Sequence, residues 1–339
     1  MRRRRWVAVA GLAVLVAWLA LPHRDLLSAA QLPVREPAGA ANDRLIIEPD
    51  DGMAPIYALL RSPQRALDLT MYELADPTAE SIIGSDAARG VRVRVVLDSR
   101  LERMRNAPAY EYLRSRGVAV SWSSSRYFVT HEKGFVIDGA TAVVMSLNLT
   151  SQYYATSRDV AVVDSDRRDA AAIEAVFAAD FTGRPIGVPA ADDLVWSPEQ
   201  SLADLLALIT SARRSVELES EELSSPEVID ALLSARRRGI AVSIAMTYDD
   251  SWRPAFARLA AAGARISVMY GERPLYIHAK LLVTDAGSIG ARAFVGSENL
   301  SDASLRRDRE LGIVLLAPRL VDEVDRVISS DLTAATSLR

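Results

Sequence analysis

From residue 44 onwards, short apolar or alternating runs take turns with longer segments that begin at a proline or end at a glycine. The short runs predict β-strands, and the longer segments predict helices. In the first half of this region the predicted strands are 66–71, 91–97, 118–122, 135–137, 141–145 and 160–163, and the predicted helices are 77–89, 109–116 and 170–181. Alternating strands and helices predict a parallel or mixed sheet covered by helices.

The second half of the region repeats this order of elements. Its predicted strands are 215–218, 240–246, 264–269, 281–283, 291–295 and 311–316, and its predicted helices are 226–238, 254–262 and 320–330. Single residues recur as well: Glu73 returns 149 positions later as Glu222, and Gly90 returns at the same offset as Gly239. A repeat this long is not a solenoid. It predicts an α/β fold of two homologous sandwich halves, each a mixed sheet flanked by helices, related by a pseudo-twofold axis.

The predicted halves cover residues 44–182 and 199–339. A segment rich in proline and glycine, 183–198, links them. A second predicted linker, 22–43, precedes the first half. A single active site built from both halves would lie on the axis between them.

The first 21 residues predict a hydrophobic helix that acts as a signal anchor or a signal peptide. Four arginines, Arg2 to Arg5, precede an apolar run of 16 residues, 6–21. As a helix this run would be about 24 Å long, between a signal-peptide core and a full membrane span. The arginines favour a cytoplasmic N-terminus. We therefore expect a membrane-anchored or secreted protein with its catalytic domain outside the cytoplasm.

Composition narrows the function classes. Half of the 339 residues are hydrophobic and a quarter are charged, as in an ordinary globular protein. The net charge of −4 is unlike that of most proteins whose main partner is nucleic acid. The chain has no cysteine, which excludes disulfides, zinc–thiolate sites, iron–sulfur clusters and cysteine nucleophiles.

The candidate chemistry is a polar pattern that occurs twice. Each copy reads His-x-Lys-x-x-x-x-Asp, then Ser-x-Asn, then a carboxylate beside an apolar run. The first copy consists of His131, Lys133, Asp138, Ser146, Asn148 and Asp159, and the second of His278, Lys280, Asp285, Ser297, Asn299 and Glu310. Residues i and i+2 of a strand point to one face, so each His and Lys leave the sheet together.

These residue types suit chemistry at a phosphate. A neutral imidazole can attack phosphorus while a second, protonated imidazole donates to the leaving oxygen. Lysine and asparagine side chains can stabilise the charge on the phosphoryl oxygens. A carboxylate, Asp159 or Glu310, can hold one ring nitrogen of a histidine protonated. We therefore predict that the two copies face each other across one phosphate, with no metal or other cofactor required.

The doubled motif resembles the phospholipase D superfamily over roughly residues 45 to 331. The resemblance implies a covalent phosphohistidine on one histidine, often that of the first copy, here His131. The other histidine, His278, would then be the general acid and base. It also implies that Asp138 and Asp285 mainly support the site structurally. The first copy departs from the family pattern because Met145 precedes its serine, where the second copy has Gly296.

Three enzyme activities remain open at this stage. The leading hypothesis is a phosphodiesterase that hydrolyses phospholipids at a membrane surface. The second is transfer of a phosphatidyl group to another alcohol, as in cardiolipin synthesis. The third is a metal-independent endonuclease, which makes nucleic acid the less favoured partner. A non-enzymatic anion-binding scaffold is disfavoured because every His, Lys and Asn of both copies is present. We expect a monomer.

Overall fold

The computed structural model describes residues 42–189, 191, 193–271 and 275–338. The predicted N-terminal helix lies outside the described residues, as does most of the linker that follows it.

The first half forms a mixed sheet with the strand order β1-β9-β7-β6-β2-β4-β5. Its elements are β1 (Arg44–Glu48), α1 (Ala54–Leu60), β2 (Ala66–Met71), β3 (Leu74–Ala75), α2 (Pro77–Ala88), β4 (Arg92–Leu97), α3 (Arg103–Ser115), β5 (Ala119–Trp122), β6 (Lys133–Ile137), β7 (Thr141–Met145), β8 (Leu149–Thr150), β9 (Ser157–Asp164) and α4 (Arg167–Phe181). Strands β2, β4 and β5 run parallel, whereas β6, β7, β9 and β1 are joined by antiparallel pairings. The short strands β3 and β8 pair separately.

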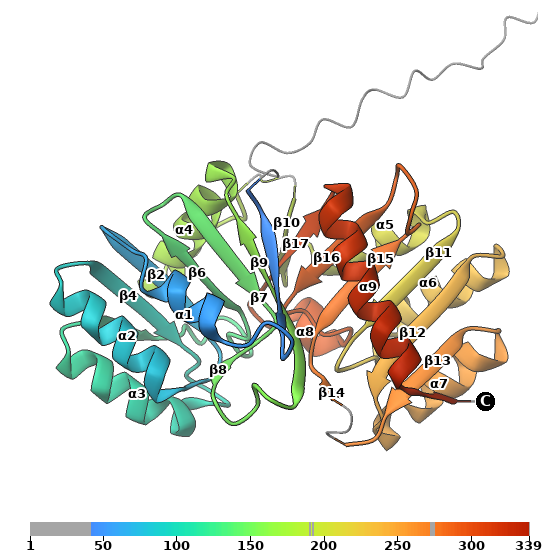
Figure 1. Ribbon diagram of the computed structural model, residues 1–339, viewed down its shortest axis with the longest axis horizontal. Helices are drawn as coiled ribbons and strands as arrows, with labels where there is room; N and C mark the ends of the chain where they lie inside the picture. Colours follow the sequence, from blue (N-terminus) through green and yellow to red (C-terminus); the bar gives the residue numbers. More distant parts are fainter. Residues whose placement is uncertain (1–41, 190, 192, 272–274, 339) are drawn as a thin grey trace, which may run out of the picture. The chain divides into compact units, whose positions relative to one another are not determined.

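The second half has the order β10-β17-β16-β15-β11-β12-β13-β18. Its elements are β10 (Leu194–Ser197), α5 (Ser201–Ser211), β11 (Ser215–Glu219), α6 (Pro226–Arg237), β12 (Ala241–Thr247), η1 (Asp250–Trp252), α7 (Arg253–Ala261), β13 (Arg265–Met269), β14 (Tyr276–Ile277), β15 (Lys280–Thr284), β16 (Arg292–Gly296), α8 (Asp302–Arg306), β17 (Glu310–Leu315), α9 (Pro318–Ala334) and β18 (Thr336–Leu338). Figure 1 shows the two sheets with their helices, the first half in blue to green and the second in yellow to red. The predicted fold of two mixed-sheet α/β halves is confirmed.

Local sequence signals explain where the repeated helices begin and end. Helix α2 begins at Pro77, and the side chain of Asp76 accepts a hydrogen bond of 2.8 Å from the Thr78 amide. Such a cap satisfies one of the free N–H groups of the first turn. Gly90 follows the helix with φ +90°, a conformation that other residues adopt only with strain. In the second half, α6 also begins at a proline, Pro226, although the Ser225 side chain makes no capping hydrogen bond there.

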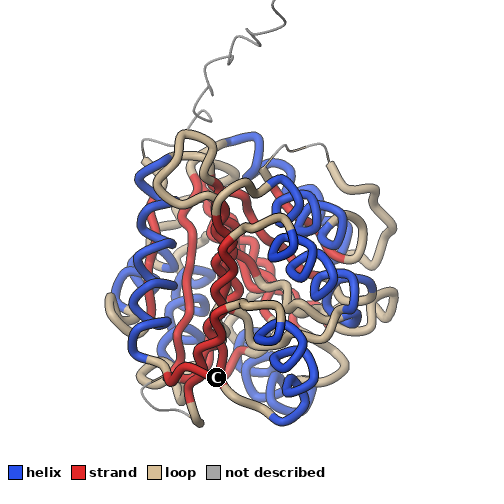
Figure 2. Tube along the Cα trace, turned by 90° about the vertical axis from the view of Figure 1, so that its right-hand side faces the viewer, coloured by secondary structure: helices blue, strands red, loops and turns tan. Residues whose placement is uncertain are grey.

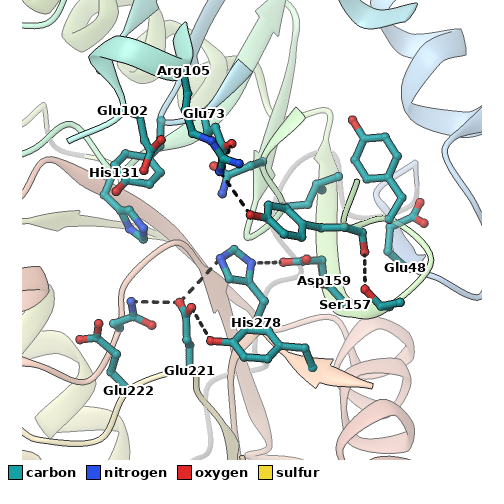
Figure 3. A pocket seen from close by; sticks show the side chains of 18 residues that line it. Glu48, Glu73, Glu102, Arg105, His131, Ser157, Asp159, Glu221, Glu222 and His278 are labelled. Carbon is teal, nitrogen blue, oxygen red and sulfur yellow. Dashed lines mark hydrogen bonds and ion pairs between the residues drawn. The ribbon is translucent and has the colours of Figure 1, made fainter. Parts of the chain in front are cut away.

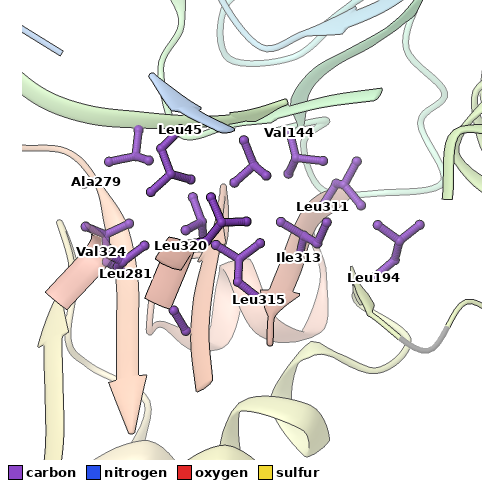
Figure 4. Packing of buried hydrophobic residues seen from close by; sticks show 14 of the residues in the cluster. Leu45, Val144, Leu194, Ala279, Leu281, Leu311, Ile313, Leu315, Leu320 and Val324 are labelled. Atoms are coloured by element: carbon purple, nitrogen blue, oxygen red, sulfur yellow. The ribbon is translucent and has the colours of Figure 1, made fainter. Parts of the chain in front are cut away.

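Buried side chains form three clusters, one of which joins the two halves. One cluster lies within the first half and another within the second. The third combines residues of both sheets, including Val144 and Val162 from the first and Leu281, Val295 and Leu311 from the second. Figure 4 shows this packing, and Figure 2 shows the strands with helices on either side. Burial of this apolar surface holds the halves in one arrangement.

The backbone also links the halves. Strand β14 of the second half pairs in parallel with β9 of the first, with Ile277 opposite Arg158. A matching bridge joins Thr130 of the first half to Arg309 of the second. Both contacts lie next to a motif histidine, so the interface between the halves is also the frame of the candidate site.

Candidate active site

Each motif histidine is anchored by the backbone of the other half. The amide of His131 donates to the Arg309 carbonyl at 2.9 Å, and the amide of His278 donates to the Arg158 carbonyl at 3.2 Å. Arg309 directly precedes Glu310, and Arg158 directly precedes Asp159. Each histidine is therefore placed beside the strand of the opposite half that carries a buried carboxylate.

The carboxylates pair with the histidines crosswise. Nδ1 of His131 lies 2.8 Å from Oε2 of Glu310, and Nδ1 of His278 lies 2.7 Å from Oδ1 of Asp159. A carboxylate accepts hydrogen bonds only, so each pair keeps a proton on Nδ1 and presents Nε2 of the ring to the cavity. The sequence predicted both orienting carboxylates but did not say which histidine each one contacts.

A serine supports each carboxylate in turn. The Ser304 hydroxyl donates to Oε1 of Glu310 at 2.5 Å, and the Ser146 hydroxyl donates to Oδ1 of Asp159 at 2.6 Å. In this structure the Ser146 hydroxyl is thus directed at Asp159, and its predicted contact with substrate stays a prediction. Ser297 exchanges hydrogen bonds with the backbone of Leu311 and, like Ser146, is fully buried. Neither serine lines the cavity described below.

The two lysines are buried under the histidines. The ammonium group of Lys133 donates to the His131 carbonyl at 2.6 Å, and that of Lys280 donates to the His278 carbonyl. Their remaining neighbours differ: Lys133 lies 4.8 Å from the centre of the Tyr72 ring, whereas Lys280 forms an ion pair of 3.0 Å with Glu221. The two half-sites are therefore not electrostatically equivalent.

Burial changes the protonation of the first half-site. It lowers the pKa of His131 below its usual value, although Glu310 acts in the opposite direction. It also lowers the pKa of Lys133 to about 7. Burial alone would raise the pKa of Glu310, but the interaction with His131, including the hydrogen bond from its ring, and the charge of Lys133 keep it lower than usual. A neutral imidazole beside an ionised carboxylate is the arrangement that a nucleophilic histidine needs.

Both imidazoles face one cavity of about 400 Å³. Figure 3 shows His131 and His278 directed into it from the two halves. The other residues that line it include Asn148 and Asn299, the tyrosines Tyr72, Tyr153, Tyr154 and Tyr276, the positively charged Arg105, and the carboxylates Glu48, Glu73, Glu102, Asp159, Glu221 and Glu222. The structure thus brings the two histidines, the two asparagines and Asp159 to one cavity. The lysines and Glu310 do not line it but contact the histidines from behind.

Asp138 and Asp285 lie elsewhere. Each follows the far end of its strand with φ near +55°, and neither lines the cavity. The Asp138 carboxylate accepts backbone N–H groups of residues 64–66, and Asp285 accepts those of residues 213–215. Both aspartates therefore connect a turn to the start of the neighbouring strand and do not reach the histidines.

Sequence reasoning missed several contributors to the site. They are Tyr72, which meets the His131 ring edge-on with 4.5 Å between ring centres, Ser304, Glu221, and Arg105, which pairs with Glu73 at 2.7 Å. Tyr72 and Glu221 do carry a sequence signal, because they occupy equivalent positions 149 residues apart. Their equivalence is visible only when the two halves are aligned beyond the motif.

The chain matches known proteins along most of its described length. A family model described as "Cardiolipin synthase, PLD-like domain" matches twice, at residues 56–181 and 205–332. The mitochondrial cardiolipin hydrolase of Xenopus tropicalis is 31% identical over 178 residues, which are 48% of this chain and 83% of that protein. The corresponding protein of Xenopus laevis is 28% identical over 179 residues, 48% of this chain and 82% of that protein.

Two solved structures share the fold. The polyphosphate kinase of Porphyromonas gingivalis superposes with a TM-score of 0.71 at 17% identity, over 87% of this chain and 48% of its own. The phosphatidylserine synthase of Haemophilus influenzae Rd KW20 superposes with a TM-score of 0.67 at 14% identity, over 89% of this chain and 88% of its own. At these identities the likeness concerns the fold alone, and the chain spans about half the length of the kinase.

The predicted location is corrected by these findings. We expected a membrane-anchored or secreted protein with the catalytic domain outside the cytoplasm, but the hydrolase relatives are named as mitochondrial, which contradicts that expectation. No helix within the described ranges is long and apolar enough to cross a bilayer. The N-terminal segment on which the expectation rested lies outside the described residues.

The remaining evidence agrees on the family. The family model covers both halves, and each match contains one complete copy of the His-x-Lys motif. The two copies meet at one cavity, as the resemblance of the motifs to the superfamily implied. This chain belongs to the phospholipase D superfamily, as a member with two PLD-like domains.

Proposed function

We propose that this protein is a phosphodiesterase of the phospholipase D type that cleaves or transfers the phosphodiester of phospholipids through a phosphohistidine. The observation that carries this proposal is the crosswise arrangement of His131 with Glu310 and of His278 with Asp159 around one cavity. It supplies two imidazoles with the same nitrogen, Nε2, available to one phosphorus atom.

In the first step His131 is the nucleophile. Its Nε2 attacks phosphorus, the bond from phosphorus to the leaving alcohol oxygen breaks, and His278 gives its Nε2 proton to that oxygen. The lowered pKa of His131 supports this assignment, because a neutral ring is required for attack. Glu310 stabilises the positive charge that the ring acquires.

In the second step a water molecule or a second alcohol attacks phosphorus. His278 Nε2 takes its proton, the bond from phosphorus to His131 breaks, and the enzyme returns to its starting state. Water gives hydrolysis, and a lipid alcohol gives phosphatidyl transfer. In both steps Lys133, Lys280 and the two motif asparagines stabilise charge on the non-bridging oxygens.

The surroundings of the cavity favour phospholipid over nucleic acid. Among the described residues that line it, Arg105 is the one arginine or lysine, against six carboxylates. Even with burial raising the pKa of Glu48 to about 7, the phosphates that flank a scissile bond in DNA would meet acidic side chains. Most phospholipids bring a single phosphodiester, and cardiolipin brings one further phosphate, whereas a DNA strand carries phosphates on both sides of the scissile bond.

Exposed apolar side chains beside the cavity support a lipid surface as the partner. Leu101 is 57% exposed and Met104 is 85% exposed, and they alternate with Glu102 and Arg105, which line the cavity. Exposed apolar residues next to arginines suit the boundary of a membrane that carries anionic lipids. Cardiolipin, which the names of the hydrolase relatives contain, is such a lipid and is the first substrate to test.

The proposal is tested with purified protein in EDTA, on vesicles of mixed phospholipids including cardiolipin and on DNA. We expect release of phosphatidate or a transfer product, and no nicked DNA. His131→Ala should abolish turnover. His278→Ala should cleave phospholipid slowly, because it lacks the acid for the first step. With a p-nitrophenyl phosphodiester, which needs no such acid, it should accumulate a phosphorylated His131 that mass spectrometry detects, because the base for the second step is missing. Full turnover by His131→Ala would refute the nucleophile, and nicking of DNA without lipid cleavage would favour the endonuclease.

A further inference from the structure

The two half-sites differ at one position of the repeat. Tyr72 follows β2, and Glu221 follows β11 at the equivalent place, 149 residues later. In the first half the tyrosine ring packs edge-on against His131 and under Lys133. In the second half a carboxylate takes this place, beside His278 and Lys280.

One oxygen of this carboxylate meets three groups of the second half-site. Oε2 of Glu221 lies 3.0 Å from Nζ of Lys280, 3.4 Å from Nδ2 of Asn299 and 3.6 Å from Nε2 of His278. The other oxygen, Oε1, accepts a hydrogen bond of 3.0 Å from the Tyr276 hydroxyl. Figure 3 shows Glu221 directed at His278. Lysine, amide and imidazole are the groups that our proposed function assigns to a phosphoryl oxygen and to the leaving oxygen.

A purely structural ion pair does not explain this geometry. Lys280 is buried, but the Glu221 side chain is 23% exposed and lines the cavity. The fold also tolerates a buried lysine at this place without such a partner, because the equivalent Lys133 lies against the ring of Tyr72. Burial would raise the pKa of Glu221, but the charges of Lys280 and His278 hold it well below its usual value, so the carboxylate is ionised.

We propose that Glu221 is a specificity residue whose carboxylate occupies a phosphoryl-oxygen position in the resting enzyme and must be displaced by substrate. This inference rests on the proposed function. A phosphodiester carries one negative charge and can replace the carboxylate at Lys280. Inorganic phosphate or a phosphomonoester carries up to two negative charges. Its second negative charge is repelled by the displaced Glu221 carboxylate, which stays at the cavity wall. Glu221 therefore selects phosphodiesters and disfavours the phosphomonoester that hydrolysis produces.

The test compares two variants that each remove one negative charge from the same cavity. Glu221→Gln keeps the shape of the side chain and removes the charge at Lys280. Glu222→Gln is the matched control, because Glu222 lines the same cavity and its side chain hydrogen-bonds to Ser301, whereas Glu221 forms the ion pair with Lys280. Binding of inorganic phosphate at pH 8 is measured by isothermal titration calorimetry on the full chain, with thermal melting as the check of folding.

We expect Glu221→Gln to bind inorganic phosphate at least tenfold more tightly than the wild type, and Glu222→Gln to differ from it by less than twofold. Glu221→Tyr, which installs the residue of the first half, should also tighten binding. Unchanged or weaker binding in both Glu221 variants would overturn the inference, since it would mean that Glu221 only holds Lys280. An equal gain in Glu222→Gln would overturn it too, as an effect of total charge.

This measurement needs no turnover, so the two proposals fail separately. If the wild type cleaves no phosphodiester but Glu221→Gln gains phosphate affinity, the anion site stands and the proposed reaction falls. If phospholipid is cleaved and phosphate binding does not respond to Glu221, the reaction stands and the role of Glu221 falls.

Discussion

Replacing Glu310 by glutamine tests how the site controls the proton of its nucleophile. Glu310 is fully buried and has two partners, the Ser304 hydroxyl at Oε1 and Nδ1 of His131 at Oε2. In Glu310→Gln the amide oxygen keeps the bond from Ser304, so the NH₂ group faces Nδ1 of His131. An NH₂ group only donates, so the ring must accept at Nδ1 and carry its proton on Nε2. The nitrogen that attacks phosphorus then has no lone pair.

The expected loss follows from the populations of the two tautomers. In the variant, the hydrogen bond from the glutamine NH₂ group to Nδ1 favours the unreactive tautomer of His131, with its proton on Nε2. The negative charge of Glu310, which would stabilise the imidazolium formed during attack, is lost as well. Loss of a positioned acid or base contributes about 10²–10⁴-fold, which corresponds to about 3–5 kcal/mol in the activation free energy. We expect kcat to fall by this factor while KM changes by less than about threefold, because Glu310 does not line the cavity.

The matched variant is Asp159→Asn, which removes the carboxylate charge that supports a protonated His278. His278 is proposed to protonate the leaving oxygen, whereas His131 is proposed to attack. A substrate that releases p-nitrophenolate needs no such proton. It should therefore restore the first step in Asp159→Asn, seen as a burst of p-nitrophenolate, and should give no burst in Glu310→Gln.

The result that refutes this reasoning is an activated leaving group that rescues Glu310→Gln and leaves Asp159→Asn slow. The two histidines would then have exchanged roles. Equal rescue of both variants would refute the tautomer argument itself.

Three further predictions follow from the structure. Lys133 must be charged to stabilise phosphate, and its pKa is about 7, so kcat/KM should fall as pH rises through about 7. In a comparison of pH–rate profiles, Lys133→Arg should move this decline to higher pH. Arg158→Met should leave the buried Asp331 carboxylate without its ion-pair partner and lower the free energy of unfolding by about 3–5 kcal/mol. Urea denaturation measures this, and an unchanged midpoint would mean that the ion pair does not stabilise the contact between the halves. Leu101→Ser combined with Met104→Ser should reduce cleavage of vesicles at least fivefold and leave a soluble short-chain substrate unaffected, and equal loss on both would exclude a docking role.

The repeated elements could be predicted from the sequence because their signals are local. Strands β2 and β7 have the predicted bounds, and helices α2 and α6 end one residue before the predicted ends. The helix predicted from residue 109 begins earlier, because α3 runs from Arg103 and contains Pro108, a residue that normally disfavours a helix interior. Strand β1 was not predicted because its partner, β9, lies more than 100 residues away and supplies the pairing that stabilises it.

The site was predictable in its residue types but not in its connections. The sequence indicated two histidines, two lysines and two orienting carboxylates, since these repeat in register. It did not give the pairing of His131 with Glu310, because this contact depends on how the halves pack, over 179 positions of sequence. The predicted domain bounds and the monomeric state stay predictions.

The crosswise contacts imply that neither half can be an enzyme with this mechanism by itself. A separated first half would keep His131 and Lys133 but lose Glu310, and with it the hydrogen bond that holds the ring in its tautomer. Its own Asp159 would face no histidine. The two copies of the repeat can differ at positions that leave these contacts between each histidine and the carboxylate of the other half intact. The pair Tyr72 and Glu221 is such a position: both contact the histidine and lysine of their own half, and only one brings a charge. Burial lowers the pKa of Lys133, whereas Lys280 has the Glu221 carboxylate beside it, and we propose that this difference helps to give the two half-sites different roles in the reaction.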